Sequence, residues 1–371
     1  MNPIHPTLHG PPRYGSHGLL DAGLAARDHA LIDDAAARRA RTVAAALPAM
    51  IGRALCLECR LGPDGPHAVD LSVHVDRDGG AELAPCALAP CDGARAWERV
   101  RTLCRAWAAP GTLAHQLVDH LWLEFDLPPH PLRGAHAGWA RPDCLDDELR
   151  IPTPSVFLAL DRDSVASGRA TAGPVLRMLA PLRGAPASAA VRHAVDHALA
   201  ALPVGVALEA VAVMLARDAT RVRLCPARLS AAEWPRWLRR LGAERLAAGL
   251  AAAVDGVLSA ADPIALGHVD VGADGIAERV GVEITLDRAS QRRGVLREQG
   301  LLDRLVARGW CTPVHRDALL HWPGASTAQL PHRLWRSIVA RHVNDVKLVI
   351  DAAGACEAKA YLVIAESGRA R

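Results

Sequence analysis

Asp70-Leu71-Ser72-Val73-His74-Val75-Asp76 and His120-Leu121-Trp122-Leu123-Glu124-Phe125-Asp126 are the two stretches that decide the fold of this chain. In both, aliphatic or phenylalanine side chains alternate with polar ones or with Trp122. Successive side chains of a β-strand point to opposite faces, so each stretch predicts a strand with one apolar and one polar face. Such strands line a barrel with a polar interior, or form an open sheet with one solvated face.

Ten strand-like segments arrive in five pairs, with helical stretches between the pairs. The paired ranges are 54–60 with 68–76, 120–127 with 155–161, 208–216 with 221–225, 265–271 with 279–287, and 345–351 with 358–364. Helical spacing of apolar residues predicts helices over 20–47, 94–118, 173–202, 230–260, 289–308, 316–321 and 328–342. Closing so wide a sheet removes its exposed edges. We therefore expect an α+β fold of repeated ββα units, a ten-stranded antiparallel barrel with a polar lumen that is ringed by helices.

The pattern predicts a single barrel domain over residues 20–365. Residues 1–19 are rich in His, Pro and Gly and are expected to form a flexible N-terminal arm, and residues 366–371 a tail. Residues 128–154 separate two strands that should be neighbours, and they carry many Pro, His and acidic residues. A connection of this length is often a lid or a binding loop, and an irregular surface excursion is the alternative.

Composition narrows the class of protein. The net charge is +3 and no basic block is interleaved with aromatic residues, so nucleic acid is not an expected partner. No apolar run is long enough to span a membrane or to form the core of a signal peptide, so we expect a cytoplasmic protein. Nine cysteines in 371 residues do not form a disulfide framework, and Cys56 and Cys59 would face opposite sides of a strand, which disfavours a shared zinc ion.

Basic residues in the last hairpin form one part of the candidate site. The chain has only two lysines, Lys347 and Lys359, and both lie near Tyr361. In a turn centred on Ala353 and Gly354, Lys347 and Tyr361 would lie nearly opposite, with Lys359 two residues along the same face. These bases either clamp a diphosphate or carboxylate, neutralise neighbouring acids, or face solvent.

Acidic, histidine and aromatic side chains form the other part. The catalytic candidates are Glu58, Glu124, Glu283 and His74. They are expected to form a structural network, to transfer protons, or to bind a metal ion. None has the helical His-x-x-x-His spacing of a hydrolytic zinc site, so no metal site is assigned. The aromatic candidates, Trp122 and Phe157, provide a floor for a flat or allylic ligand, or are plain core residues.

The element order and three short motifs resemble the prenyltransferase barrel, the α-β-β-α (ABBA) fold of the aromatic and indole prenyltransferases. Arg221-Val222-Arg223-Leu224-Cys225 is similar to the Arg-x-Lys-x-Tyr pattern that indole-type members carry on strand six. Lys359-Ala360-Tyr361 matches a Lys-x-Tyr pattern, and Glu58 stands where the family has an early Glu. The chain departs from the family on strand two, where Asp70 and His74 appear without the usual Arg, and its two tyrosines are too few for a tyrosine cage.

The resemblance implies transfer of a prenyl group from a prenyl diphosphate to an aromatic or peptide acceptor in natural-product metabolism. On this expectation the diphosphate is held by Arg221, Arg223, Lys347 and Lys359. The base is Glu58 or Glu124. The allylic cation is lined by Trp122, Phe157 and Tyr361. No cofactor is required, although Mg²⁺ is compatible with the reaction. Two alternatives stay open: a metal-assisted or acid/base enzyme acting on a peptide or polar natural-product intermediate, and a non-catalytic barrel that binds a small molecule.

Overall fold

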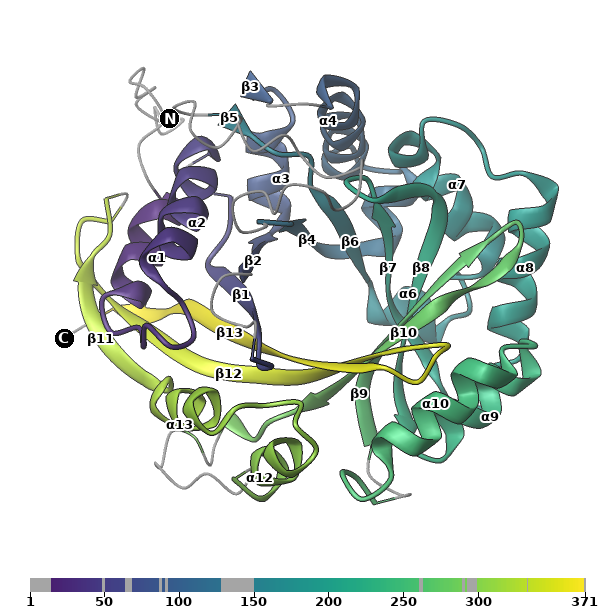
Figure 1. Cartoon of the computed structure of the whole chain (residues 1–371). Coiled ribbons are helices and arrows are strands. Elements are labelled where there is room, and N and C mark those ends of the chain that lie inside the picture. The colour runs from purple at the N-terminus through teal and green to yellow at the C-terminus, as the bar shows by residue number, and fades with distance from the viewer. Residues whose placement is uncertain are drawn as a thin grey trace.

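The computed structural model of the chain describes residues 15–48, 51–63, 69–86, 89–90, 93–127, 150–259, 263–288, 291, 299–331 and 333–369. Ten strands within these ranges close into one antiparallel barrel, and most of the helices surround it (Figure 1). The barrel strands are β1 (Ala54–Arg60), β2 (Val69–Val75), β4 (Val118–Phe125), β6 (Ser155–Leu160), β7 (Ala207–Met214), β8 (Asp218–Ser230), β9 (Pro263–Gly272), β10 (Gly275–Thr285), β12 (Arg336–Asp351) and β13 (Cys356–Arg369). The ten-stranded antiparallel barrel predicted from the sequence is confirmed.

Closure of the barrel joins strands that are far apart in the sequence. The order around the barrel is β10-β9-β8-β7-β6-β4-β2-β1-β13-β12, and pairing of β12 with β10 completes the ring. Glu58 of β1 lies opposite Tyr361 of β13, and Glu283 of β10 lies opposite Lys347 of β12. β11 (Gly324–Gln329) extends the sheet from the first residues of β12, and β3 (Ala89–Pro90) pairs with β5 (Arg150–Ile151) in a separate parallel ladder.

The helices cover the outer face of the sheet. They are α1 (Gly15–Leu24), α2 (Asp34–Ala46), α3 (Arg77–Leu83), α4 (Ala94–Ala108), α5 (Leu113–Leu117), α6 (Arg162–Ala166), α7 (Ala172–Arg183), α8 (Ala189–Ala200), α9 (Glu233–Arg240), α10 (Glu244–Val254), α12 (Gln299–Ala307) and α13 (Pro313–His321). Pro110 and Gly111 separate α4 from α5, and Gly184 ends α7 in the left-handed conformation that glycine favours (φ 74°). No helix in the described ranges is long and apolar enough to cross a membrane.

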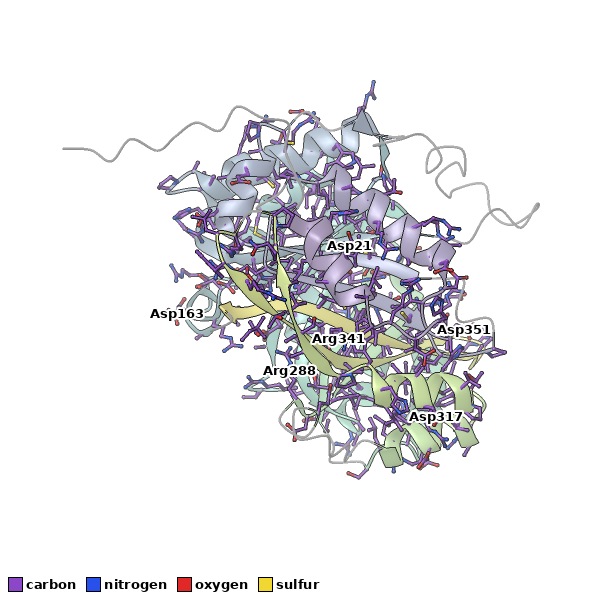
Figure 2. All side chains as sticks on the ribbon, turned by 90° about the vertical axis from the view of Figure 1, so that its left-hand side faces the viewer. Asp21, Asp163, Arg288, Asp317, Arg341 and Asp351 are labelled. Carbon is purple, nitrogen blue, oxygen red and sulfur yellow. The ribbon has the colours of Figure 1, made fainter. Side chains whose placement is uncertain are left out.

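The start of β12 corrects one expectation. The sequence predicts a helix over 328–342, but these residues contain the end of β11 and the first part of β12. Ser337 and Val339 are buried between more exposed neighbours, and the segment pairs with β11 on one side and β13 on the other. The two ladders satisfy the backbone groups, so tertiary pairing overrides local helical spacing. Arg341, labelled in Figure 2, extends from this strand and donates to the carbonyl oxygen of Ala26 at 3.0 Å.

The ends of the domain differ in detail from the expected boundaries. α1 begins at Gly15, within the range expected for the arm, and β13 continues to Arg369, beyond the expected end at 365. Residues 1–14 and 128–149 lie outside the described residues, so most of the expected arm and lid is not described. The final residues of the expected lid contain β5.

The two faces of the barrel sheet carry two separate apolar clusters. The larger cluster fills the space between the strands and the outer helices. The smaller one lies on the inner face and is called the apolar wall here; it consists of Phe157, Ala210, Ala212, Met214 and Cys225, with Trp122 and Leu266 packed against it. Strand alternation places polar side chains beside this wall, because Glu124 and Trp122 lie two residues apart on β4. The barrel interior therefore has an apolar part and a charged part.

Candidate functional site

Side chains from five strands meet in the charged part of the barrel interior. Glu58 comes from β1, His268 from β9, Glu283 from β10, Lys347 from β12, and both Lys359 and Tyr361 from β13. All six side chains are largely buried, and they are called the central cluster here. Adjacent strands bring them together because β13 pairs with both β1 and β12, while β10 pairs with both β9 and β12.

The register of the last hairpin differs from the expected one. Lys347 lies directly opposite Lys359, whereas the sequence analysis placed Tyr361 nearly opposite Lys347. The Asp351 carboxylate accepts hydrogen bonds from the backbone N–H groups of Ala353 and Ala355, and these bonds close a turn centred on Ala353 rather than between Ala353 and Gly354. Lys347 nevertheless reaches Tyr361, since its Nζ donates to the phenolic oxygen at 2.8 Å.

Glu58 lies between the two lysines. Its Oε1 is 2.5 Å from the Nζ of Lys359, and its Oε2 is 3.7 Å from the Nζ of Lys347. Burial raises the pKa of Glu58, but Lys359 and Lys347 outweigh burial and hold that pKa well below its usual range. Glu58 is therefore an ionised carboxylate in a largely dry environment, and its two cationic partners keep it so.

His268 and Glu283 form a second pair within the central cluster. His268 Nε2 lies 2.6 Å from Glu283 Oε1, and His268 Nδ1 lies 4.0 Å from the Sγ of Cys225 on β8. Burial, followed by Lys347 and Arg223, lowers the pKa of His268 well below its usual range, so the imidazole is neutral. Burial raises the pKa of Glu283 to about 7, against the opposing effect of Lys347.

The two arginines expected to hold diphosphate occupy different places. Arg223 makes a bidentate contact with Asp270, at 2.7 and 2.8 Å, and its guanidinium carbon lies 5.8 Å from the centre of the Phe157 ring. Arg223 thus lies where the apolar wall meets the charged part. Arg221 instead contacts Asp274 in the β9–β10 turn and Asp218 at the start of β8, both at the end of the barrel. The structure brings Arg223, but not Arg221, beside the central cluster.

Glu124 belongs to an acidic group that also contains Asp70 and Asp126 and that contacts Arg217. Arg217 Nη2 donates to Glu124 at 2.9 Å, and Arg217 Nε donates to Asp126 at 2.8 Å. Asp70 accepts a hydrogen bond from the backbone N–H of Leu127, and burial together with Asp126 raises its pKa to about 7. Arg217 is not among the candidates drawn from the sequence; the signal that could have pointed to it is its place in the connection between β7 and β8, three residues after Met214 of the apolar wall.

His74 lies apart from the central cluster. Its ring is 4.8 Å from that of His120 and 5.1 Å from that of Trp122, centre to centre. Burial, followed by His120, lowers the pKa of His74 to about 4. Within the described ranges, no group of three or more His, Cys, Asp or Glu side chains could hold a metal ion. His74 is therefore a neutral imidazole that packs against the rings of His120 and Trp122.

A pocket of about 470 Å³ opens at the end of the barrel, between α10 and the β9–β10 and β12–β13 turns. Arg245, Arg279 and Asp351 line it, and Asp270 reaches it from the interior. Asp351 is labelled at the end of β12 in Figure 2. Because Asp270 also holds Arg223, the pocket adjoins the charged part of the interior.

Comparison with known proteins found matches among solved structures only. No protein-family model matches the chain, and no curated protein sequence matches it. The prenyltransferase PriB, solved in its apo form, is 15% identical over 94% of each chain, with a TM-score of 0.46. AnaPT from Neosartorya fischeri is 11% identical over 85% of this chain and 78% of its own, with a TM-score of 0.45. The 6-dimethylallyltryptophan synthase from Micromonospora olivasterospora, solved with DMASPP and Trp, is 13% identical over 95% of this chain and 97% of its own, with a TM-score of 0.41.

In fold, the chain resembles a prenyltransferase barrel. This rests on its own strand pairing: ten antiparallel strands close into one ring, with helices on the outside and a polar face inside. The architecture inferred from element order is therefore confirmed.

Proposed function

We propose that this chain is an enzyme that transfers a prenyl group from a prenyl diphosphate to an aromatic or peptide acceptor. The observation that carries the proposal is the division of the barrel interior. An apolar wall built on Phe157 and Met214 adjoins a cluster in which Glu58 is held ionised between two lysines. A prenyl diphosphate has the same division, with an apolar chain at one end and an anion at the other.

The diphosphate would bind to Lys347, Lys359 and Arg223. An ammonium group has three N–H donors and a guanidinium has five. Lys347 donates to Tyr361, Lys359 donates to Glu58, and Arg223 uses two donors on Asp270, so each cation retains donors for phosphate oxygens. Because the cations are already fixed in place, they stabilise the departing diphosphate without reorganising.

Glu58 would take the proton that the acceptor loses. An ionised carboxylate accepts a proton or a strong hydrogen bond from an aromatic N–H or O–H. Trp122 and Phe157 would contact the allylic part of the prenyl group. The apolar wall, to which Phe157 belongs, would exclude water from the allylic cation. We propose that no cofactor is required; Mg²⁺, where present, would be carried by the diphosphate oxygens. Removal of divalent cations with EDTA should therefore lower the turnover without abolishing it.

A second candidate is an acid/base enzyme that acts on a polar or cationic intermediate. It is favoured by the acidic group around Arg217, where Glu124, Asp126 and Asp70 together outnumber the single cation. Burial raises the pKa of Glu124, and it raises the pKa of Asp70 to about 7, so Asp70 is suited to hold a proton near neutral pH.

Calorimetric titration separates the two candidates. Dimethylallyl, geranyl and farnesyl diphosphate are each titrated into the full chain, with inorganic diphosphate as a control for binding of the anion alone. Prenyl transfer predicts that the prenyl compounds bind more tightly than inorganic diphosphate, because their prenyl group buries apolar surface against the apolar wall. If none of the four compounds binds, the prenyl-transfer proposal is wrong and the acid/base candidate is left.

A further inference from the structure

The acidic group around Arg217 contains three carboxyl groups and one guanidinium. Arg217 donates to Glu124 at 2.9 Å and to Asp126 at 2.8 Å, so its single charge is shared between two carboxylates. Asp70, the third carboxyl, accepts from the backbone N–H of Leu127 at 3.0 Å. Carboxylates that leave water need a cation in contact, and Arg217 can neutralise only one charge of this group.

The register of the sheet places this group between the two other parts of the barrel interior. Asp70 of β2 lies directly opposite Glu58 of β1, which belongs to the central cluster. Glu124 of β4 lies two residues from Trp122, which packs against the apolar wall. A ligand bound at the acidic group would therefore reach both the apolar wall and Glu58.

The hydroxyl of Ser155 adds an independent observation at the same place. Ser155 of β6 lies directly opposite Glu124, and side chains that are directly opposite share one face of a sheet about 5 Å apart. Its side chain is fully buried, and its Oγ has no hydrogen-bond partner within the described part of the chain. A buried hydroxyl without a partner is unfavourable, so its position beside Glu124 points to a ligand that supplies the missing hydrogen bond.

An ammonium group has the chemistry that these three residues lack. It has three N–H donors and a positive charge, and it has no acceptor. Asp70, Glu124 and Ser155 can each accept one of its hydrogen bonds, and its charge offsets the excess of carboxylates. An anion would be repelled at this place, and a neutral donor would leave the excess charge without a counter-ion.

The acidic group can be reached from solvent. The side chain of Arg217 is 36% exposed, whereas that of Glu124 is 7% exposed. Arg217 lies in the connection between β7 and β8, and the start of β8 pairs with the end of β9. The acidic group is thus at the same end of the barrel as the pocket beside the β9–β10 turn.

We infer that the prenyl acceptor is an aromatic amine whose protonated amino group binds to Asp70, Glu124 and Ser155. This inference rests on the proposed prenyl transfer and names the chemical class of its acceptor. The amino group is held as a cation and takes no part in bond formation. The aromatic ring lies against Trp122, on the side of the acidic group that faces the apolar wall. Glu58, opposite Asp70, then lies on the side where the ring loses its proton.

A pair of ligands that differ in this one charge tests the inference. Tryptamine is protonated at neutral pH, and N-acetyltryptamine has the same ring without the charge. Each is titrated into the full chain by calorimetry, with indole-3-propionate as the anionic analogue. Tryptamine should bind about 10-fold or more tightly than N-acetyltryptamine, as expected for one charge-assisted hydrogen bond, and indole-3-propionate should bind most weakly. Equal affinity for tryptamine and N-acetyltryptamine, or no binding of tryptamine, overturns the inference.

Two substitutions locate the site. Asp70→Asn should weaken tryptamine binding about 10-fold or more and leave N-acetyltryptamine binding unchanged. Ser155→Ala should weaken tryptamine binding about 3-fold or more without lowering the melting temperature, because the Ser155 hydroxyl has no partner to lose. Glu209→Gln, which removes an exposed carboxylate on β7, is the control and should change neither affinity. An equal loss for both ligands in Asp70→Asn would mean that Asp70 only supports the fold, and it overturns the inference.

Titration of dimethylallyl diphosphate separates this inference from the proposed function. If the diphosphate binds while tryptamine and N-acetyltryptamine bind equally, the ammonium site is wrong and prenyl transfer stands. If tryptamine binds with the expected preference while no prenyl diphosphate binds, prenyl transfer is wrong, and the ammonium site is supported as the binding site of the acid/base candidate.

Discussion

Lys347 and Lys359 face each other directly across β12 and β13, and the carboxylate of Glu58 lies between their ammonium groups. Two buried cations in register repel each other unless an anion separates them. In the described structure Glu58 provides that anion. A diphosphate that entered the barrel would meet the same pair of cations.

The first prediction concerns Glu58 itself. Glu58→Gln leaves two buried lysines without their anion, so the free energy of unfolding should fall by about 3 kcal/mol, the lower end for breaking a buried ion pair. Diphosphate affinity should rise, because the lysines no longer contact a carboxylate, while kcat falls with loss of the base. Urea unfolding, calorimetric titration and steady-state kinetics measure the three effects, with Glu209→Gln, a substitution of an exposed carboxylate on β7, as the control. A weaker diphosphate affinity would contradict the placement of the anion beside Glu58.

The two lysines should differ from each other. Lys347→Ala and Lys359→Ala should each weaken prenyl diphosphate binding by about 1.5–3 kcal/mol, the contribution of a charge-assisted hydrogen bond. Lys359 makes the shorter contact with Glu58, so Lys359→Ala should lower stability more than Lys347→Ala. Titrations and thermal melts of both variants test this. Loss of stability with unchanged affinity would mean that the lysines only neutralise Glu58.

Arg223 and Arg221 provide a matched pair of substitutions two residues apart on β8. Arg223→Gln should weaken prenyl diphosphate binding by about 1.5–3 kcal/mol, since its guanidinium lies between the apolar wall and the central cluster. Arg221→Gln should weaken it less, because Arg221 contacts Asp274 in a turn at the end of the barrel. Equal losses in the two variants would show that the diphosphate binds at the barrel end.

Stability should fall as pH rises toward and through neutrality. Burial raises the pKa of Asp70, Glu283 and Asp345 to about 7, whereas carboxyls in an unfolded chain titrate near about 4. Between these values the folded state binds more protons than the unfolded state, so each group removes up to about 1.4 kcal/mol per pH unit as pH increases. Urea unfolding from about pH 6.5 to about pH 8, above the range in which the lowered pKa values of His74 and His268 oppose this trend, should show the loss, with a shallower slope in Asp345→Asn. A rise in stability over that window would contradict the raised pKa values.

The lid expected over residues 128–154 stays a prediction from sequence. Its length and its Pro, His and acidic residues favour a segment that covers one end of the barrel. Limited proteolysis should cut within this range first, and prenyl diphosphate should slow the cut. Cleavage that begins elsewhere, at a rate that ligand does not change, would argue for a plain surface loop.

The sequence by itself determined most of the barrel strands and the inward faces of β2 and β4. Alternation on β2 and β4 predicted that Ser72 and Glu124 share the interior, and the two residues are paired there. Ser230 and Glu233 also form a local pair, in which the Ser230 hydroxyl accepts from the Glu233 N–H while the Glu233 carboxylate accepts from the Ser230 N–H. These features are local, because each depends on a few consecutive residues.

The tertiary structure alone decided which charges meet. The register that places Lys347 opposite Lys359 depends on a turn centred on Ala353 rather than between Ala353 and Gly354, and such a shift changes every cross-strand pair. The helix expected over 328–342 became strand because β11 and β13 supply its hydrogen-bond partners from elsewhere in the chain. The contacts of Glu58 with Lys359, and of His268 with Glu283, require barrel closure and adjacent strands in a definite register. A local pattern specifies the face on which a side chain lies, whereas long-range pairing specifies its neighbour and therefore its protonation.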